Sequence, residues 1–218
     1  MTRRTFVVGD VHGCREELEA LVAKAELTLA DRLVLAGDLV ARGPDSQGVV
    51  QLARERGALA VLGNHDAHLL EVGLGHSAKE KHLALAKTMT RRDWEYLEGL
   101  PLYLDLPELN ALVVHAGLLP HLPLDQQPRR HLLNLRSIDA HGEPSARVDG
   151  GVPWASRWEG PRRVVFGHDA LRGLQRHPHA LGIDTGCVYG HRLTGVWLPE
   201  GRLVQVPALK TWKVADGA

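Results

Sequence analysis

Cysteine, aromatic residues and long apolar runs are all scarce in this chain of 218 residues. Its two cysteines, Cys14 and Cys187, exclude the disulfide framework of a small secreted protein, and neither lies in a Cys-x-x-Cys pair. No stretch approaches the roughly 18 apolar residues of a transmembrane helix, and the apolar run near the basic N-terminus is too short for a signal peptide. We therefore expect a cytoplasmic protein with no membrane segment.

A surplus of either charge is also missing, because 26 lysines and arginines balance 26 aspartates and glutamates. The chain therefore has no bulk electrostatic attraction to nucleic acid or to an anionic membrane, and local groups must bind any anionic substrate. Hydrophobic residues make up 44% and charged residues 24%, which is ordinary for a globular protein and excludes extended disorder. The 13 histidines are unusual and give a first indication of a metal site.

Short apolar runs alternate with amphipathic stretches over the first part of the chain. The runs predict strands over 5–8, 33–36 and 59–62, and periodic apolar positions predict helices over 15–25 and 46–56. Strands that alternate with helices indicate βαβ units and a mostly parallel sheet.

After Pro101 the pattern changes to shorter elements. Further strands are predicted over 102–106 and 111–114, as a hairpin, and over 164–166, 180–183, 193–198 and 203–206. Between them, 120–160 is rich in Pro, Arg, Asp and Gly and has no clear period, so we expect an irregular insertion. The length favours one elaborated domain over 1–218.

Several of the predicted strands end in glycine followed by a polar residue, or in a histidine beside glycine. The blocks are GDVHG (9–13), GDLVARGP (37–44), GNHD (63–66), HAG (115–117) and GH (167–168). Ligands of open α/β sheets bind outside the carboxyl ends of the strands, so we expect these side chains to converge at one edge. Carboxylates, an amide oxygen and imidazoles are ligands of Mn, Fe, Co or Zn. The sequence therefore predicts a metal site there.

These five blocks, in this order, resemble those of the calcineurin-like metallophosphoesterases of the phosphoprotein-phosphatase type, and the resemblance extends from Phe6 to about Leu198. GDLVARGP, GNHD and the later IDTG (183–186) are most similar to the symmetrical diadenosine tetraphosphate hydrolases. The resemblance implies an α/β sandwich of two mixed β-sheets flanked by helices, with metals at the carboxyl edge of the strands.

Carried over position by position, the resemblance also implies two divalent metal ions, Mn²⁺ or alternatively Co²⁺, Fe²⁺ or Zn²⁺. The implied ligands are Asp10, His12 and Asp38 for one ion and Asp38, Asn64, His115 and His168 for the other, with Asp38 as the bridge. Two ions ~3.5–4 Å apart can lower the pKa of a bridging water and clamp the oxygens of an in-line displacement.

Two further residues of the blocks are expected to act on the substrate. Arg42 has the forked donors that suit phosphate oxygens. His65, the imidazole not assigned to a metal, is expected to be the general acid on the leaving oxygen. Relatives that dephosphorylate proteins usually have an aspartate at the position of Ala41, where it pairs with the histidine of the GNH block. Without it another group must orient His65, and Asp66 is its neighbour in sequence.

Some residues near the blocks are open to two interpretations. Arg157 and Trp158 are candidates for a second phosphate contact and a stacking surface for a base, and the alternative is a core tryptophan beside a paired arginine. Cys14 and Cys187 lie next to two blocks, and we interpret them as small buried packing residues.

The predicted function is metal-dependent hydrolysis of diadenosine tetraphosphate, cut symmetrically to two ADP. Ala41 favours this reaction, because a nucleoside diphosphate leaves more easily than a serine alkoxide. The alternatives are a protein serine/threonine or tyrosine phosphatase, a broad phosphoesterase, and a nucleotide sensor that no longer hydrolyses its ligand. RNA capped by a 5′ tetraphosphate-linked nucleoside presents the same anhydride and is an alternative substrate. The sequence leaves the oligomeric state open.

Overall fold

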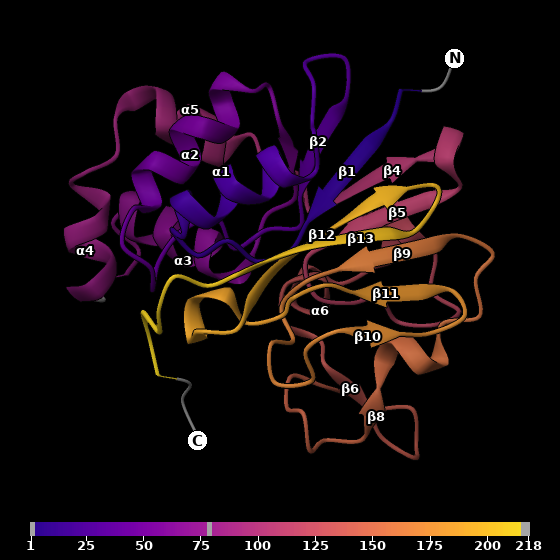
Figure 1. The fold of residues 1–218 in the computed structure, drawn as a ribbon. Coiled ribbons are helices and arrows are strands. Elements are labelled where there is room, and N and C mark those ends of the chain that lie inside the picture. Colours follow the sequence, from indigo (N-terminus) through magenta and orange to yellow (C-terminus); the bar gives the residue numbers. More distant parts are fainter. Residues whose placement is uncertain (1–2, 78–79, 215–218) are drawn as a thin grey trace.

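Two five-stranded sheets lie at the centre of the protein (Figure 1). The computed structural model describes residues 3–77 and 80–214. The first sheet contains β1 (Thr5–Val8), β2 (Arg32–Leu35), β3 (Leu59–Ala60), β12 (Arg192–Leu198) and β13 (Arg202–Pro207). Its strand order is β13-β12-β1-β2-β3. The expected strand over 5–8 is confirmed at both ends, because a fully buried strand with apolar residues on both faces has a plain sequence signal.

The second sheet has the order β10-β11-β9-β5-β4. Its strands are β4 (Tyr103–Leu106), β5 (Ala111–Val114), β9 (Arg163–Phe166), β10 (Gln175–Arg176) and β11 (Ala180–Gly182). Parallel and antiparallel pairs occur in both sheets: β1 pairs with β2 in parallel and with β12 antiparallel, and β5 pairs with β9 in parallel and with β4 antiparallel. The predicted α/β sandwich of two mixed sheets is therefore confirmed, as is the 102–114 hairpin.

Side-chain alternation along the central strands explains why the sheets stack. In β1, Phe6 and Val8 pack against the helices of the first sheet, while Val7 joins the apolar layer between the sheets. In β5, Val113 faces the same layer and Leu112 faces the other way. Because side chains alternate with a period of two, a strand that is apolar throughout is buried on both faces.

Helices cover the outer face of the first sheet (Figure 1). They are α1 (Arg15–Lys24), α2 (Ser46–Glu55), α3 (Asn64–Gly73), α4 (Glu80–Ala86) and α5 (Arg91–Glu98). The outer face of the second sheet is covered by α6 (Arg129–Asn134) and by the 3₁₀ turn η3 (Trp154–Arg157). Trp154 is buried there, with its ring 4.9 Å from that of Phe166. No helix in the described part of the chain is long and apolar enough to cross a membrane.

The stretch 120–160 contains more regular structure than its composition indicates. Besides α6 it holds a small antiparallel sheet of β6 (Ser137–Ile138), β7 (Pro144–Ser145) and β8 (Val152–Pro153) in the order β7-β6-β8. Each of these strands has two residues, which is too short for a detectable period.

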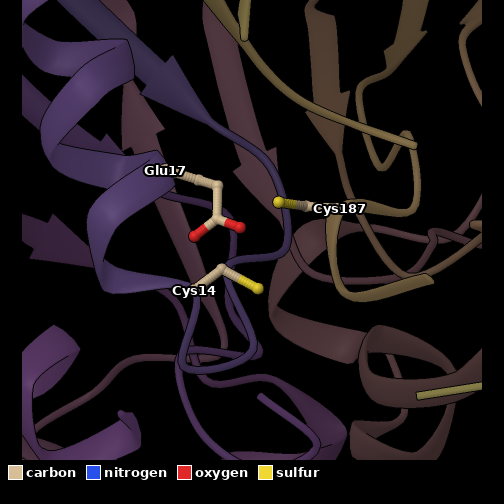
Figure 2. A group of neighbouring side chains, drawn as sticks. All are labelled: Cys14, Glu17 and Cys187. Atoms are coloured by element: carbon tan, nitrogen blue, oxygen red, sulfur yellow. The ribbon is translucent and has the colours of Figure 1, made fainter. Parts of the chain in front are cut away.

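The C-terminal strap, defined as residues 208–214, follows β13 and lies over the turn η4 (Cys187–Tyr189). Its anchor is Glu17 of α1, whose Oε1 accepts hydrogen bonds from the backbone N–H of Leu209 (3.1 Å) and from Nε1–H of Trp212 (3.2 Å). Glu17 is 2% exposed, and Figure 2 shows its carboxylate beside the thiols of Cys14 and Cys187. A buried carboxylate therefore ties the strap to the first helix.

Replacing Glu17 by alanine should lower the free energy of unfolding by about 1–3 kcal/mol, because two donors lose their shared acceptor. Glu16→Ala is the matched control: the side chain is exposed on the same helix turn, and its loss should change stability by about 0.5 kcal/mol or less. Urea denaturation of both variants measures the difference, and equal stabilities would contradict the anchoring role.

Candidate metal centre

The block after β1 brings the first group of metal-ligand candidates together. The Nδ1 of His12 lies 3.1 Å from the carbonyl of Val40, which leaves its Nε2 facing Asp38 Oδ2 at 3.4 Å and Asp10 Oδ2 at 3.9 Å. A carbonyl on one imidazole nitrogen selects the tautomer whose other nitrogen is free to bind a metal. Asp10, His12 and Asp38 offer ligand atoms within 4.8 Å of one another, and all three side chains are buried.

The remaining candidates meet on the other side of Asp38. Nε2 of His115 lies 3.6 Å from Asp38 Oδ1, and its Nδ1 lies 2.9 Å from the carbonyl of Ala36. Oδ1 of Asn64 is 3.0 Å from both His115 Nε2 and His168 Nδ1. All six sequence-predicted ligands therefore form one cluster between the two sheets' carboxyl edges, with Asp38 in contact with both halves.

The backbone at these blocks adopts conformations that most residues avoid. His12, Asp38, Ala41, Arg42 and His168 have positive φ angles between 48° and 70°, and they are five of the eight such non-glycine residues among those described. A left-handed backbone conformation costs energy at residues other than glycine, and such residues cluster at functional sites. A Cβ on Gly63 would clash with the amide and Oδ1 of Asp38, so glycine is required where the two blocks touch.

Two buried polar atoms in the cluster lack a partner among the described residues: Asp10 Oδ2 and His168 Nε2. Burial lowers the pKa of His12 to about 3 and lowers the pKa of His115 and His168, so these imidazoles are neutral. Burial also raises the pKa of Asp38 to about 7. A divalent cation would give the unpaired atoms a partner, bind the free nitrogens of the neutral imidazoles and stabilise the charged form of the carboxylates. The donor set therefore fits a transition metal.

A pocket of about 520 Å³ opens beside this cluster, and Arg42 is one of its walls. Arg42 donates a hydrogen bond to the hydroxyl of Tyr189, and its guanidinium carbon lies 5.4 Å from the centre of that ring. Arg136 is a second cation on the pocket, held by the carbonyl of His168 at 3.1 Å. Two arginines therefore face the metal-ligand cluster from different loops.

His65 lines the pocket and follows Asn64 in the block after β3. Its backbone N–H donates to Asp38 Oδ1 at 2.8 Å, and its ring centre lies 5.0 Å from that of His12. Its Nδ1 is buried without a partner among the described residues. Burial, together with the positive charge of Arg42, lowers the pKa of His65, so this imidazole is also neutral.

Asp66 does not orient His65. Its carboxylate accepts hydrogen bonds from the backbone N–H groups of Leu39 (3.0 Å), Val40 (3.2 Å) and Gly63 (3.0 Å). The side chain is fully buried and ties the block after β2 to the block after β3. Its role is to fix the backbone of two ligand-bearing loops.

The structure does not bring Arg157 and Trp158 to this pocket. They line a separate pocket of about 360 Å³ near Pro120, where Trp158 is half-buried and donates its Nε1–H to the carbonyl of Arg162 at 2.9 Å. Arg162 precedes β9, so Trp158 lies at the opposite end of that strand from His168.

Residues that the sequence alone did not identify take their place. They are Asn134, Arg136 and Tyr189, and the pocket is also lined by His191 and by Asp184 of the IDTG block. Asn134 and Arg136 come from the stretch without a period, so no local signal marks them. Asp184 also has a structural role, since its Oδ1 accepts a hydrogen bond from the backbone N–H of Gly186 at 3.0 Å.

The two cysteines lie behind the metal-ligand cluster, on the α1 side. Cys14 and Cys187 are 0% and 1% exposed and belong to the core between α1 and the first sheet, which confirms their interpretation as buried packing residues. Together with Glu17 they form a second group with ligand atoms within 4.8 Å of one another (Figure 2). The Glu17 carboxylate already accepts the two strap hydrogen bonds described above.

Metal binding should weaken as the pH falls below about 7, because burial raises the pKa of the Asp38 carboxyl to about 7 and that of Asp10 well above its usual range. Below that pH the ion must displace protons, which costs up to about tenfold in affinity per pH unit for each proton. Titration calorimetry with Mn²⁺ at pH 6 and 7.5, in buffers of different ionisation enthalpy, should show proton release at pH 6. An affinity independent of pH would contradict this.

Comparison with known proteins agrees with this geometry. Residues 3–196 match the family model described as calcineurin-like phosphoesterase. The chain is 32% identical to the asymmetrical bis(5′-nucleosyl)-tetraphosphatase PrpE of Oceanobacillus iheyensis, over 92% of this chain and 90% of the relative. It is 30% identical to the symmetrical bis(5′-nucleosyl)-tetraphosphatase of Coxiella burnetii, over 94% of this chain and 92% of the relative.

Among solved structures, one provisionally described as a diadenosine tetraphosphatase superposes with a TM-score of 0.89 at 43% identity, and 95% of each chain is covered. The chain belongs to the calcineurin-like metallophosphoesterases.

Proposed function

We propose that this protein is a metal-dependent hydrolase that cleaves diadenosine tetraphosphate symmetrically to two ADP. Similarity to curated relatives named as bis(5′-nucleosyl)-tetraphosphatases supports the substrate class. The names of these relatives include both symmetrical and asymmetrical enzymes, so the position of the cut has to be measured on the products.

The proposed metal ligands are the six residues of the cluster described above. Asp10, His12 and Asp38 would hold one ion and Asp38, Asn64, His115 and His168 the other, with Mn²⁺ as the proposed metal. The bound ions would supply an activated water and neutralise charge on the attacked phosphate. The protein contributes fixed imidazole tautomers, set by the carbonyls of Val40 and Ala36, and ligand loops held by Asp66.

Arg42 is proposed to bind an oxygen of the attacked phosphate. Its guanidinium lines the same pocket as His12 and Asn64, and Tyr189 holds it in place. A net charge of zero gives the whole protein no attraction for an anion, so a positioned guanidinium has to provide it. Arg136 lines the same pocket and can neutralise a second phosphate.

The observation that favours a phosphoanhydride as the substrate is that His65 is neutral and has no carboxylate partner among the described residues. Its Nδ1 has no carboxylate partner among the described residues, and its pKa is lowered by burial. A neutral imidazole donates a hydrogen bond to a leaving oxygen but is a poor source of a full proton. A nucleoside diphosphate departs as a stable anion and needs no proton, whereas a serine alkoxide does. The site therefore suits a phosphoanhydride better than a phosphoprotein.

The two free cysteines lie within 4.8 Å of each other, and both are thiols. Thiols persist in reducing compartments. Together with a nucleotide substrate, they support a cytoplasmic location, which we include in the proposal.

Replacing His65 by asparagine should reduce kcat for diadenosine tetraphosphate by about 10- to 100-fold, at the low end of what a general acid contributes. The neutral imidazole supplies a hydrogen bond to the leaving oxygen, and this bond is lost. Metal content, measured by elemental analysis, should remain that of the wild type, because His65 is not among the proposed ligands. Full activity of the variant would refute its role.

The function itself is tested on metal-depleted protein given diadenosine tetraphosphate, with and without Mn²⁺, and with a phosphopeptide in parallel. ADP as the single nucleotide product, formed only with metal, is the expected result. Equal amounts of ATP and AMP would show an asymmetrical cut. Phosphate released from the peptide while the dinucleotide stays intact would show that the phosphatase alternative holds, and binding without turnover would indicate a sensor.

A further inference from the structure

A second pocket, of about 430 Å³, opens beside the metal pocket and shares Arg42 and His65 with it. Its other walls come from three separate segments. Ala41 belongs to the block after β2, His82 and Leu85 lie one turn apart on α4, and Lys213 belongs to the C-terminal strap. This second pocket contains none of the six proposed metal ligands.

The walls of the second pocket suit an anion that carries a flat apolar group. Arg42 and Lys213 are cations, and no carboxylate is among the described residues that line it. The ring of His82 is stacked on that of His65, with ring centres 6.2 Å apart and planes 29° from parallel, and Leu85 adds an apolar side chain. Imidazole and leucine faces can support a purine, and the two cations can neutralise its phosphates.

Lys213 is placed there by the fold of the strap. The backbone N–H groups of Trp212 and Lys213 both donate to the carbonyl of Val188, at 3.0 and 3.1 Å. Glu17 holds the same segment through Leu209 and Trp212 (Figure 2 shows Glu17 beside Cys187, the first residue of η4). The strap is therefore fastened to η4 at Lys213 itself and to α1 through residues that precede it, and η4 also presents Tyr189 to Arg42.

The two pockets meet at Arg42 and His65, which line both of them. In an in-line displacement the attacking oxygen and the leaving group lie on opposite sides of the reacting phosphate. A phosphate held by these two residues borders both the metal pocket and the second pocket, so its leaving group has a neighbouring pocket to enter.

We propose that the second pocket receives the leaving nucleoside diphosphate and that Lys213 is the residue that binds its phosphates. This inference rests on the proposed function and specifies its substrate class: the enzyme selects leaving groups that carry phosphate. Because residue 41 is an alanine, this position places no carboxylate beside those phosphates.

The test compares Lys213→Met with Lys210→Met. Lys210 is on the same strap, with its Nζ 4.1 Å from the centre of the Trp212 ring, and it does not line the pocket. The selectivity ratio, kcat/KM for diadenosine tetraphosphate divided by kcat/KM for p-nitrophenyl phosphate, should fall at least tenfold in K213M. K210M should keep the wild-type ratio, and Lys213→Arg should retain most of it because its charge is conserved.

Inhibition by ADP separates this inference from the proposed function. ADP should inhibit hydrolysis of p-nitrophenyl phosphate, and its inhibition constant should rise at least fivefold in K213M but not in K210M. If the wild type leaves the dinucleotide intact while ADP inhibition still depends on Lys213, the proposed function is wrong and the pocket stands. If the dinucleotide is cleaved but K213M and K210M behave alike in both assays, the role of Lys213 is overturned.

Discussion

The burial of acidic and imidazole side chains at one edge of two stacked sheets is the constraint on which this structure depends. Burial raises the pKa values of Asp10 and Asp38 and lowers those of the histidines around them. Nothing apolar could stabilise such a cluster, and two of its atoms have no partner among the described residues. A divalent cation would compensate for both effects. The strained backbone and the glycines at the strand ends serve the same purpose, because they let five separate blocks approach within ligand distance.

The chemistry of the site then follows from what surrounds His65. The carboxylate of its neighbour Asp66 accepts hydrogen bonds from three backbone amides and none from the imidazole of His65, so it stabilises the ligand loops and does not orient that ring. Ala41 offers no carboxylate in its place. An imidazole that is buried among other imidazoles and an arginine stays neutral, and a neutral imidazole matches a leaving group that needs no proton. The burial of His65 and the lack of a carboxylate at Ala41 therefore connect local packing with the choice of substrate.

The C-terminal strap and the turn η4 add a second pocket beside the metal-ligand cluster. The strap returns from β13 to α1, where Glu17 anchors it, and on the way it fastens to η4. Through η4 it supports Tyr189, which holds Arg42, and it carries Lys213 to the neighbouring pocket. One buried glutamate thus connects the stability of the C-terminal segment with the placement of Arg42 and Lys213, the two cations that line the second pocket. In Figure 1 this segment runs past the helical side of the first sheet.

The sequence by itself determined the approximate positions of the main strands and the polar blocks that follow them, since strand periodicity and glycine beside a polar residue are local signals that survive without any partner. The sandwich and the six clustered ligands were expected from the resemblance of those blocks to a known family. It also placed Arg42 and His65 at the site. Only the tertiary structure decided which other residues join them: Arg136 enters from a stretch of two-residue strands, Tyr189 and Lys213 come from segments brought together by long-range hydrogen bonds, and Arg157 and Trp158 turn away to another pocket. Irregular segments take their positions from contacts distant in sequence, and such contacts leave no periodic trace in the residues that make them.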